Sequence, residues 1–324
     1  MDDAQAKAVR ASLRWLGLAG GALAASAVFG VLWARGAERR HPPAGRLVGA
    51  LHRRIHLVQK GSGADVVLIH GTGLTLDDMI VGPFDTLARS YHVTAVDRPG
   101  HGYSDPCADV SAEAQAERIR EAVRELGLAR PVLVGHSLGA TVALTYAMLW
   151  PDEIAGVVAM APLAYPDWTA VHFVAALHAL PVLGPFLSRT VFAVSDPLMA
   201  PLACRYTFAP KAPTPRFRRD FPMGLATRPG STCSDGRDVM AVARSIVRLS
   251  PRYDDIQSPV AVLVGTNDLV LSPRRHALRL AAALGDKARL ETVSGQGHMV
   301  HHDQPARLTS AVAWVRARHA GAGG

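Results

Sequence analysis

Cysteine is scarce in this sequence of 324 residues, and the spacings that usually mark metal sites are missing. Its three cysteines, Cys107, Cys204 and Cys233, are too few for a disulfide framework, and no C-x-x-C or mixed His/Cys spacing occurs. One Cys204–Cys233 bridge would fit the count, although three unpaired thiols fit it better. We therefore predict no metal site, and we predict no cofactor.

Acidic residues are outnumbered in the sequence, with 27 Asp and Glu against 35 Lys and Arg and a formal net charge of +8. Such an excess can attract anionic partners. The sequence nevertheless lacks the Lys/Arg-rich run interleaved with aromatic residues that a nucleic-acid-binding surface needs. Its densest internal basic stretch, RFRRD at 216–220, is interpreted as a solvated face. We therefore predict no nucleic-acid partner.

A long uncharged run is present near the N-terminus. The 20 residues from Trp15 to Ala34 carry no charge, which is the length needed to cross a hydrocarbon core of about 30 Å. A helix buried in a soluble core would have one polar face, and this run has none. We predict a transmembrane helix at 13–34. The alternative is a cleaved signal peptide with ASA at 25–27 as its cleavage site, but the apolar run continues beyond that site.

Basic residues flank this segment unevenly. Lys7, Arg10 and Arg14 precede it, and a larger group follows it: Arg35, Arg39, Arg40, Arg46, Arg53 and Arg54. The positive-inside rule therefore slightly favours a cytoplasmic location of the following domain over the outside.

From residue 46 onward, short apolar runs alternate with helical patterns. Runs rich in β-branched residues end in turn signals at 66–70, 92–97, 131–136, 154–161 and 260–265. Continuous apolar runs are typical of strands buried on both faces of a parallel sheet. Capped helical patterns lie at 111–127 and 272–285, and 53–61 resembles an edge strand. The alternation predicts an α/β fold with a mainly parallel, doubly wound sheet.

The alternation breaks between 163 and 250, where prolines and apolar helical pieces replace it. We predict a helical lid insertion over the carboxyl ends of the strands, where open parallel sheets bind ligands. Segment 168–202 is rich in apolar residues, and we expect part of this set to line a pocket. The set is Trp168, Val171, Phe173, Val174, Leu177, Leu180, Val182, Leu183, Phe186, Leu187, Val191, Phe192, Leu198, Met199 and Leu202.

The motif GHSLG places Ser137 between a predicted strand and a predicted helix. So sharp a bend needs Gly135 and Gly139, which have no Cβ atoms to clash within it. The bend exposes the serine over the edge of the sheet, in the strand–turn–helix context that a G-x-S-x-G nucleophile requires. The sequence therefore predicts Ser137 as a nucleophile.

A serine nucleophile needs a base, and the base is usually a histidine held by a carboxylate. His298 follows a strand-like segment, and Asp268 follows the strand at 260–265. Both fall where strands end, on the side where Ser137 emerges. We predict a catalytic triad of Ser137, His298 and Asp268.

Other residues nearby could take two of these roles. His301 and His302 are alternative bases, and Asp167 is an alternative acid because it also follows a strand. Asp303 is a weaker alternative acid, since it is too close in sequence to His298 to reach the ring from the opposite side.

An oxyanion hole also needs backbone donors. Leu138 N–H begins the helix after the nucleophile, and the loop HGTG at 70–73 follows a strand. We predict Leu138 and Thr72 as the two donors. His70 is interpreted as structural.

Five motifs occur in a distinctive order: HGTG (70–73), DRPGHGYSD (97–105), GHSLG (135–139), GTNDLV (265–270) and GHMVHHDQP (297–305). With the order serine, aspartate, histidine, the chain resembles the α/β-hydrolase superfamily over about 46–319. In such proteins the turn at 97–105 shapes the floor of the site, so Asp97 and Arg98 are expected to be structural. Epoxide hydrolases and haloalkane dehalogenases of the superfamily have an aspartate at the elbow, so Ser137 disfavours those activities.

The resemblance implies a serine hydrolase without a cofactor, and we expect a serine esterase acting on a small apolar ester or acyl substrate. A carbon–carbon bond hydrolase, a haloperoxidase-like perhydrolase and an acyltransferase are the alternatives with the same triad. A fold used only for binding is disfavoured by the complete triad. The predicted organisation is an N-terminal tail (1–12), a transmembrane anchor (13–34), a linker (35–45), an α/β-hydrolase domain (46–319) with its lid domain (163–250), and a flexible tail (320–324).

Overall fold

The computed structural model describes residues 3–167 and 170–322. Within them, one eight-stranded sheet has the order β1-β2-β4-β3-β5-β6-β7-β8. The strands are β1 (Arg46–Val48), β2 (Ile55–Lys60), β3 (Asp65–Ile69), β4 (His92–Val96), β5 (Val132–His136), β6 (Gly156–Met160), β7 (Val260–Gly265) and β8 (Ala288–Val293). Strands β1 and β2 pair antiparallel, β2 pairs antiparallel with β4, and all later pairs are parallel. The predicted edge strand at 53–61 is therefore an inner strand, because β1 pairs with its free side.

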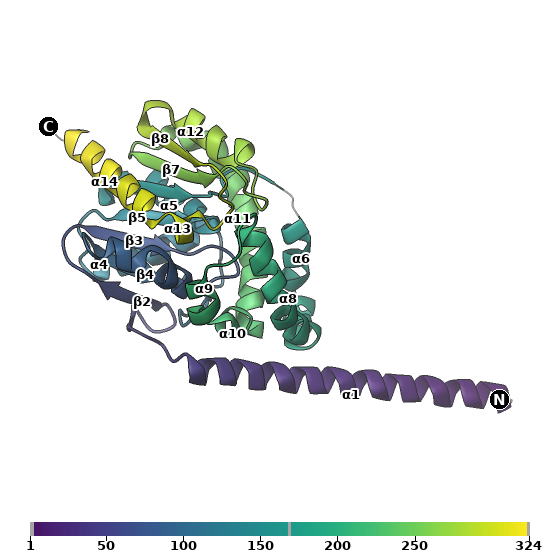
Figure 1. Ribbon diagram of the computed structural model, residues 1–324. Coiled ribbons are helices and arrows are strands. Elements are labelled where there is room, and N and C mark those ends of the chain that lie inside the picture. The colour runs from purple at the N-terminus through teal and green to yellow at the C-terminus, as the bar shows by residue number, and fades with distance from the viewer. Residues whose placement is uncertain (1–2, 168–169, 323–324) are drawn as a thin grey trace.

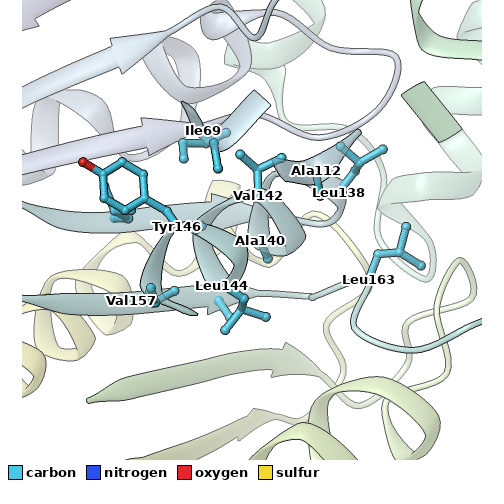
Figure 2. Packing of buried hydrophobic residues seen from close by; sticks show 14 of the residues in the cluster. Ile69, Ala112, Leu138, Ala140, Val142, Leu144, Tyr146, Val157 and Leu163 are labelled. Carbon is cyan, nitrogen blue, oxygen red and sulfur yellow. The ribbon is translucent and has the colours of Figure 1, made fainter. Parts of the chain in front are cut away.

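Helices cover both faces of the sheet. They are α2 (Leu76–Met79), α3 (Asp85–Leu87), α4 (Ala112–Glu125), α5 (Leu138–Leu149), α12 (Arg279–Leu284), α13 (Val300–Asp303) and α14 (Pro305–Ala322). Alternate residues of one strand serve two separate cores: Val67 packs in the core that includes α4, α5 and α12, and Val66 packs in the core that includes α2, α3 and α14. Helix α5 is apolar on all sides and almost wholly buried, as Figure 2 shows. The sheet is therefore doubly wound, as predicted.

The register brings several loops to one edge of the sheet. Ile69 pairs with Val96 on β4 and with Gly135 on β5. The three parallel strands therefore end together, and the loops that carry the sequence motifs leave from this edge.

A helical insertion separates β6 from β7. It contains α6 (Ala170–Ala179), α7 (Leu183–Arg189), α8 (Val191–Phe208), α9 (Pro215–Asp220), α10 (Met223–Ala226) and α11 (Pro229–Leu249). Helix α11 packs along α6 and also contacts α4 and α5, so it connects the insertion to the sheet domain. Figure 1 shows these helices on one side of the sheet. Trp168, one of the apolar residues singled out above, lies outside the described residues.

Helix α1 (Asp3–Arg40) precedes the sheet domain and extends well beyond it, as Figure 1 shows. Its segment Arg10–Arg40 contains a window of 18 residues with a mean hydropathy of 1.8, and it is the one helix among the described residues that is long and apolar enough to cross a membrane. Residues 35–40, predicted as part of a linker, are the last turns of this helix.

Candidate active site

Ser137 occupies a strained turn between β5 and α5. Its backbone has φ 54° and ψ −117°, a left-handed conformation that costs energy for a residue with a side chain. The two glycines of the motif are required by contact. A Cβ on Gly135 would lie 2.3 Å from the carbonyl oxygen of Gly139, and a Cβ on Gly139 would lie 2.4 Å from that of Ile69. The local sequence therefore forms the sharp bend that the motif predicts.

His298 and Asp268 meet at the ends of neighbouring strands. The Nδ1 atom of His298 lies 2.7 Å from Oδ2 of Asp268, and both side chains are buried. The other carboxylate oxygen, Oδ1, accepts the backbone N–H groups of Val270 at 2.8 Å and Leu271 at 2.9 Å. An ionised carboxylate only accepts, so Nδ1 of His298 carries the proton and Nε2 has a free lone pair.

The alternative histidines are engaged by a different carboxylate. His301 Nε2 lies 3.0 Å from one oxygen of Asp78, and His302 Nε2 lies 2.8 Å from the other. Burial raises the pKa of Asp78, but the two histidines outweigh this effect and hold the pKa well below its ordinary value. Asp78 therefore binds both rings from the side of α2.

The alternative acids also have other partners. Asp167 accepts a hydrogen bond from Arg275 at 2.6 Å and lies 3.2 Å from Nε2 of His276. Asp303 lies 3.5 Å from the ammonium group of Lys211. The structure thus brings His298 together with Asp268 and gives the other candidate acids different contacts.

Ser137 and His298 line one cavity of about 270 Å³. Its lining residues are Thr72, Gly73, Leu74, His136, Ser137, Leu163, Ala203, Cys204, Tyr206, Thr207, Val239, Val270, Leu271, His298 and Met299. The lining residues that the structure describes include no Asp, Glu, Lys or Arg. Burial lowers the pKa of His136 well below its ordinary value, so this ring brings no charge to the cavity.

The lid contributes different residues to the cavity from those we expected. Among the side chains that the structure describes, the lid part of the wall comes from Ala203, Cys204, Tyr206 and Thr207 at the end of α8 and from Val239 on α11, and no described member of the apolar set at 168–202 lines it. Leu198 and Leu202 of that set are 72% and 60% exposed. Helical spacing explains the difference, because the face of α8 that carries these two leucines is turned away from the face that carries Cys204 and Thr207.

The loop HGTG lies directly against the serine. A Cβ on Gly71 would lie 3.1 Å from Cβ of Ser137, and Thr72 lines the same cavity. Leu138 is the first residue of α5, so its N–H is one of the unpaired donors at a helix N-terminus. Both predicted donor residues are therefore next to Ser137.

A family model described as the alpha/beta hydrolase fold matches residues 66–305. The chain belongs to this family. An uncharacterized protein of Mycobacterium tuberculosis is 33% identical over 267 residues, which cover 78% of this chain and 75% of that protein. The 2-(acetamidomethylene)succinate hydrolase of Mesorhizobium japonicum is 30% identical over 269 residues, which cover 80% of this chain and 90% of the relative.

Solved structures of α/β-hydrolases share the fold. A membrane phospholipase A described as a bacterial virulence factor has a TM-score of 0.64 at 21% identity, over 97% of this chain and 98% of the other. An esterase from Exiguobacterium antarcticum has a TM-score of 0.69 at 20% identity, over 84% of this chain and all of the other. At these identities, the likeness concerns the fold alone.

Arg98 holds the HGTG loop of this α/β-hydrolase through the loop's carbonyl oxygens. Its guanidinium is fully buried and donates to the carbonyl oxygens of His70 at 3.1 Å and Gly71 at 3.2 Å. Its backbone N–H donates to Nε2 of His70 at 3.0 Å. Both ring nitrogens of His70 are thereby used, since Nδ1 lies 2.8 Å from the carbonyl oxygen of Gly71. Burial and Arg98 lower the pKa of His70 to about 3, so the ring is neutral.

Asp235, on the lid helix α11, holds the same loop through a backbone N–H group. Its Oδ1 accepts the backbone N–H of Gly73 at 2.9 Å and lies 2.9 Å from Nε2 of His101. Burial raises the pKa of Asp235, but His101, Arg98 and the Gly73 N–H outweigh it and lower the pKa below its ordinary value. Sequence reasoning missed this residue, because an aspartate within a helical insertion belongs to no motif and its partners are more than 130 residues away.

Proposed function

We propose that this chain is a serine hydrolase that cleaves a carboxylic ester with an apolar acyl group. The observation that carries the proposal is one cavity, with no Asp, Glu, Lys or Arg among its described lining residues, that contains a serine at a strained elbow and a histidine held by a buried carboxylate. In the proposal, Ser137 is the nucleophile, His298 the base and Asp268 the residue that orients the base.

Acylation begins when Ser137 Oγ attacks the ester carbonyl carbon while Nε2 of His298 takes the hydroxyl proton. Asp268 stabilises the imidazolium that forms. His298 then gives its proton to the leaving alkoxide as the carbon–oxygen bond breaks, and an acyl-serine remains. A water molecule attacks this acyl group with His298 again as base, which releases the acid and returns the proton to Ser137.

The negative charge on the carbonyl oxygen would be stabilised by the N–H groups of Thr72 and Leu138. Leu138 adds the positive end of the α5 dipole. Arg98 and Asp235 would act as positioning residues, since Arg98 binds the carbonyl oxygen of Gly71 and Asp235 binds the N–H of Gly73, on either side of Thr72 in the sequence. Removal of one oxyanion donor typically costs a factor of about 10²–10³ in kcat.

The cavity supports an apolar acyl group of short to medium length. Leu74, Leu163, Val239, Leu271 and Met299 are among the apolar residues of its wall. Burial of a bound chain contributes about 0.8 kcal/mol per methylene. The volume of about 270 Å³ lies slightly below the range of about 300–1,000 Å³ typical of small-molecule pockets. A dicarboxylate such as the succinate of the Mesorhizobium relative would leave its charges without a cationic partner in this lining.

The test measures kcat/KM for p-nitrophenyl esters from acetate to palmitate, with fluorophosphonate labelling in parallel. We expect labelling at Ser137 and a several-fold rise of kcat/KM over the first added methylenes. A flat or falling series from acetate onward would contradict the apolar pocket, and the absence of labelling would contradict the nucleophile.

Carbon–carbon bond hydrolysis is the second candidate. The 2-hydroxy-6-oxo-6-phenylhexa-2,4-dienoate hydrolase of Burkholderia cepacia is 26% identical over 279 residues. A panel of vinylogous diketones beside the esters separates the two reactions, and the same panel with alcohols or peroxide as acceptors tests acyl transfer and perhydrolysis.

We further propose that α1 anchors the enzyme in a membrane through residues 13–34, with residues 46–319 on the cytoplasmic side. The uncharged run and the exposed residues 10–22 of α1 support this, and the similar fold of a membrane phospholipase A fits it. Full-length protein should appear in the membrane fraction at its intact mass. A mature N-terminus near Val28 would support a signal peptide instead.

A further inference from the structure

One face of α1 packs against the lid. Ser26, Gly30, Trp33 and Ala37, spaced by three or four residues, are buried or half-buried, whereas residues 11–22 are exposed. Ser26 Oγ donates to the carbonyl oxygen of Thr190 at 2.5 Å, at the junction of α7 and α8. The lid therefore lies against the second half of the uncharged run.

Further contacts hold α1 against the lid. Gly30 lies so close to α8 that a Cβ there would be 2.8 Å from Cβ of Ala193. Trp33 Nε1 donates to Thr227 Oγ1 at 3.1 Å. The N–H of an indole and a serine hydroxyl are both paired within the protein, as groups placed in hydrocarbon need to be.

The length of α1 sets how far the lid must enter a bilayer. The uncharged run extends from Trp15 to Ala34, but only residues 15–25 precede the hydrogen bond that joins Ser26 to the lid. At 1.5 Å per residue, those residues span about 16 Å, roughly half of a hydrocarbon core of about 30 Å. If α1 spans the bilayer, the remaining length of about 14 Å also lies in hydrocarbon, and the lid segments in contact with it lie there too.

The lid carries the surface that such a position requires. Large apolar side chains of α6 to α8 and their connections are exposed; they are Leu177, Leu180, Val182, Leu183, Phe186, Val191, Leu198, Met199 and Leu202. In Figure 1, α6 and α8 form the side of the domain toward which the N-terminal half of α1 projects. These nine side chains lie within residues 177–202, and we call them the lid face; exposed apolar residues gathered in one segment are typical of surfaces that contact a membrane or a partner.

The lid segment that carries these apolar side chains also has few charged residues. Between Asp167 and Arg205, the sequence holds two charged residues, Arg189 and Asp196. Asp196 is half-buried, and its carboxylate lies 3.8 Å from the ring of His178. The long side chain of Arg189 can reach toward a headgroup layer, as arginines near membrane interfaces do. The lid face is therefore apolar without an exposed acidic group among its described residues.

We propose that the lid face enters one leaflet of a lipid bilayer together with α1, and that the enzyme takes its ester substrate from the lipid phase. The inference rests on the proposed membrane anchor and deepens the proposed function, because it assigns the substrate to lipid-dissolved esters. Helix α8 links the two sites, since one side carries Leu198 and Leu202 toward the lipid while Cys204 and Thr207 line the cavity with Ser137.

The first experiment measures depth and needs no catalytic turnover. Full-length protein with its native cysteines replaced receives an environment-sensitive fluorophore at Val182→Cys or Leu198→Cys, in vesicles of phosphatidylcholine and phosphatidylglycerol (3:1). Leu290→Cys, 40% exposed on β8 at the opposite edge of the sheet from β1, is the control. We expect a blue shift and quenching by acyl-chain quenchers at the two lid positions only.

Equal emission at the lid and control positions would overturn the proposal, even if the ester hydrolysis proposed above is confirmed. A blue shift that rises with protein concentration without lipid would also overturn it, because a second copy of the chain would then cover the lid face. Failure of ester hydrolysis leaves the depth measurement unchanged, so the two proposals fail separately.

A pair of glycine variants tests the coupling between α1 and the lid. Gly30→Leu should separate the two, because a Cβ there collides with Ala193, and the blue shift at Val182→Cys should fall while the protein stays in the membrane fraction. Gly17→Leu has open space around it and should change neither. An unchanged signal in Gly30→Leu would contradict the docking of α1 on the lid within the bilayer.

The second experiment measures access to substrate. The double variant Val182→Glu/Leu198→Glu should hydrolyse a water-soluble butyrate ester at the wild-type rate and lose several-fold in rate on a long-chain ester dissolved in vesicles. Leu290→Glu should leave both rates unchanged. Equal losses on the two substrates, or no loss on either, would refute uptake through the lid face.

Discussion

Replacement of Asp268 by asparagine should remove activity with little effect on folding. The hydrogen bonds of the Asp268 carboxylate explain why. Oδ1 of Asp268 accepts two backbone N–H groups, from Val270 and Leu271, and Oδ2 accepts one N–H from His298. An asparagine can keep its oxygen in only one of these places. Two backbone donors outweigh one ring donor, so the amide oxygen takes the Oδ1 place and the NH₂ group faces His298.

The size of the expected loss in kcat follows from the tautomer of His298. An NH₂ group donates, so Nδ1 of His298 must accept and the ring proton moves to Nε2. A protonated Nε2 cannot take the proton of Ser137. The loss in kcat for an orienting aspartate replaced by asparagine is on the order of 10⁴, or about 5.4 kcal/mol of transition-state stabilisation. The reverse orientation would leave two buried N–H groups unpaired, at about 1–3 kcal/mol each.

The assay measures kcat on p-nitrophenyl butyrate and the melting temperature, each for the wild-type protein and for Asp268→Asn. Asp167→Asn is the matched control, because Asp167 pairs with Arg275 and His276 rather than with His298. We expect the control to keep activity within about a factor of three. A loss of less than tenfold in Asp268→Asn, or a larger loss in Asp167→Asn, would refute the assigned acid.

Four further predictions concern the same site. Ser137→Ala should abolish turnover and fluorophosphonate labelling with an unchanged melting temperature; labelling that persists would point to another nucleophile. His298→Ala should reduce kcat about as much as Ser137→Ala, whereas His301→Ala should act mainly on stability; the opposite ranking would make His301 the base. Asp235→Leu should lower kcat about tenfold with a smaller effect on KM, because the Gly73 N–H loses its acceptor, and Asp235→Asn should recover part of it. Since folding lowers the pKa of Asp235, its stabilisation is present above the unfolded value of about 3.9 and is lost as pH falls through the folded pKa; urea unfolding between pH 7 and pH 3 should show an acid loss that is smaller in Asp235→Asn.

Much of the fold could be predicted from the sequence, because it depends on contacts within short segments. Each strand of the parallel sheet is an apolar run that needs burial on both faces, and the sharp bend at Ser137 needs glycines at fixed positions around it. Motif order then indicated the family that the comparison confirms. The helix over 13–34 was visible for the same reason, since length and the absence of charge are properties of one segment.

Only the tertiary structure determines which of several similar side chains pair with one another. His298, His301 and His302 lie within five residues of one another, and only the packing of α2 gives Asp78 to the last two and leaves His298 to Asp268. The part of the cavity wall that comes from Ala203, Cys204, Tyr206 and Thr207 was missed because the rotation of α8 about its axis decides which of its faces turns inward.

The sequence by itself determined the order of strands and helices, the elbow and the candidate residues, because these follow from local geometry and from hydrophobic patterns a few residues long. The tertiary structure alone decided the histidine–aspartate pairing, the hold of Asp235 on the Gly73 N–H and the docking of α1 on the lid. Each of these joins atoms from segments far apart in the chain, and their distance in space depends on how whole layers pack rather than on any spacing in the sequence.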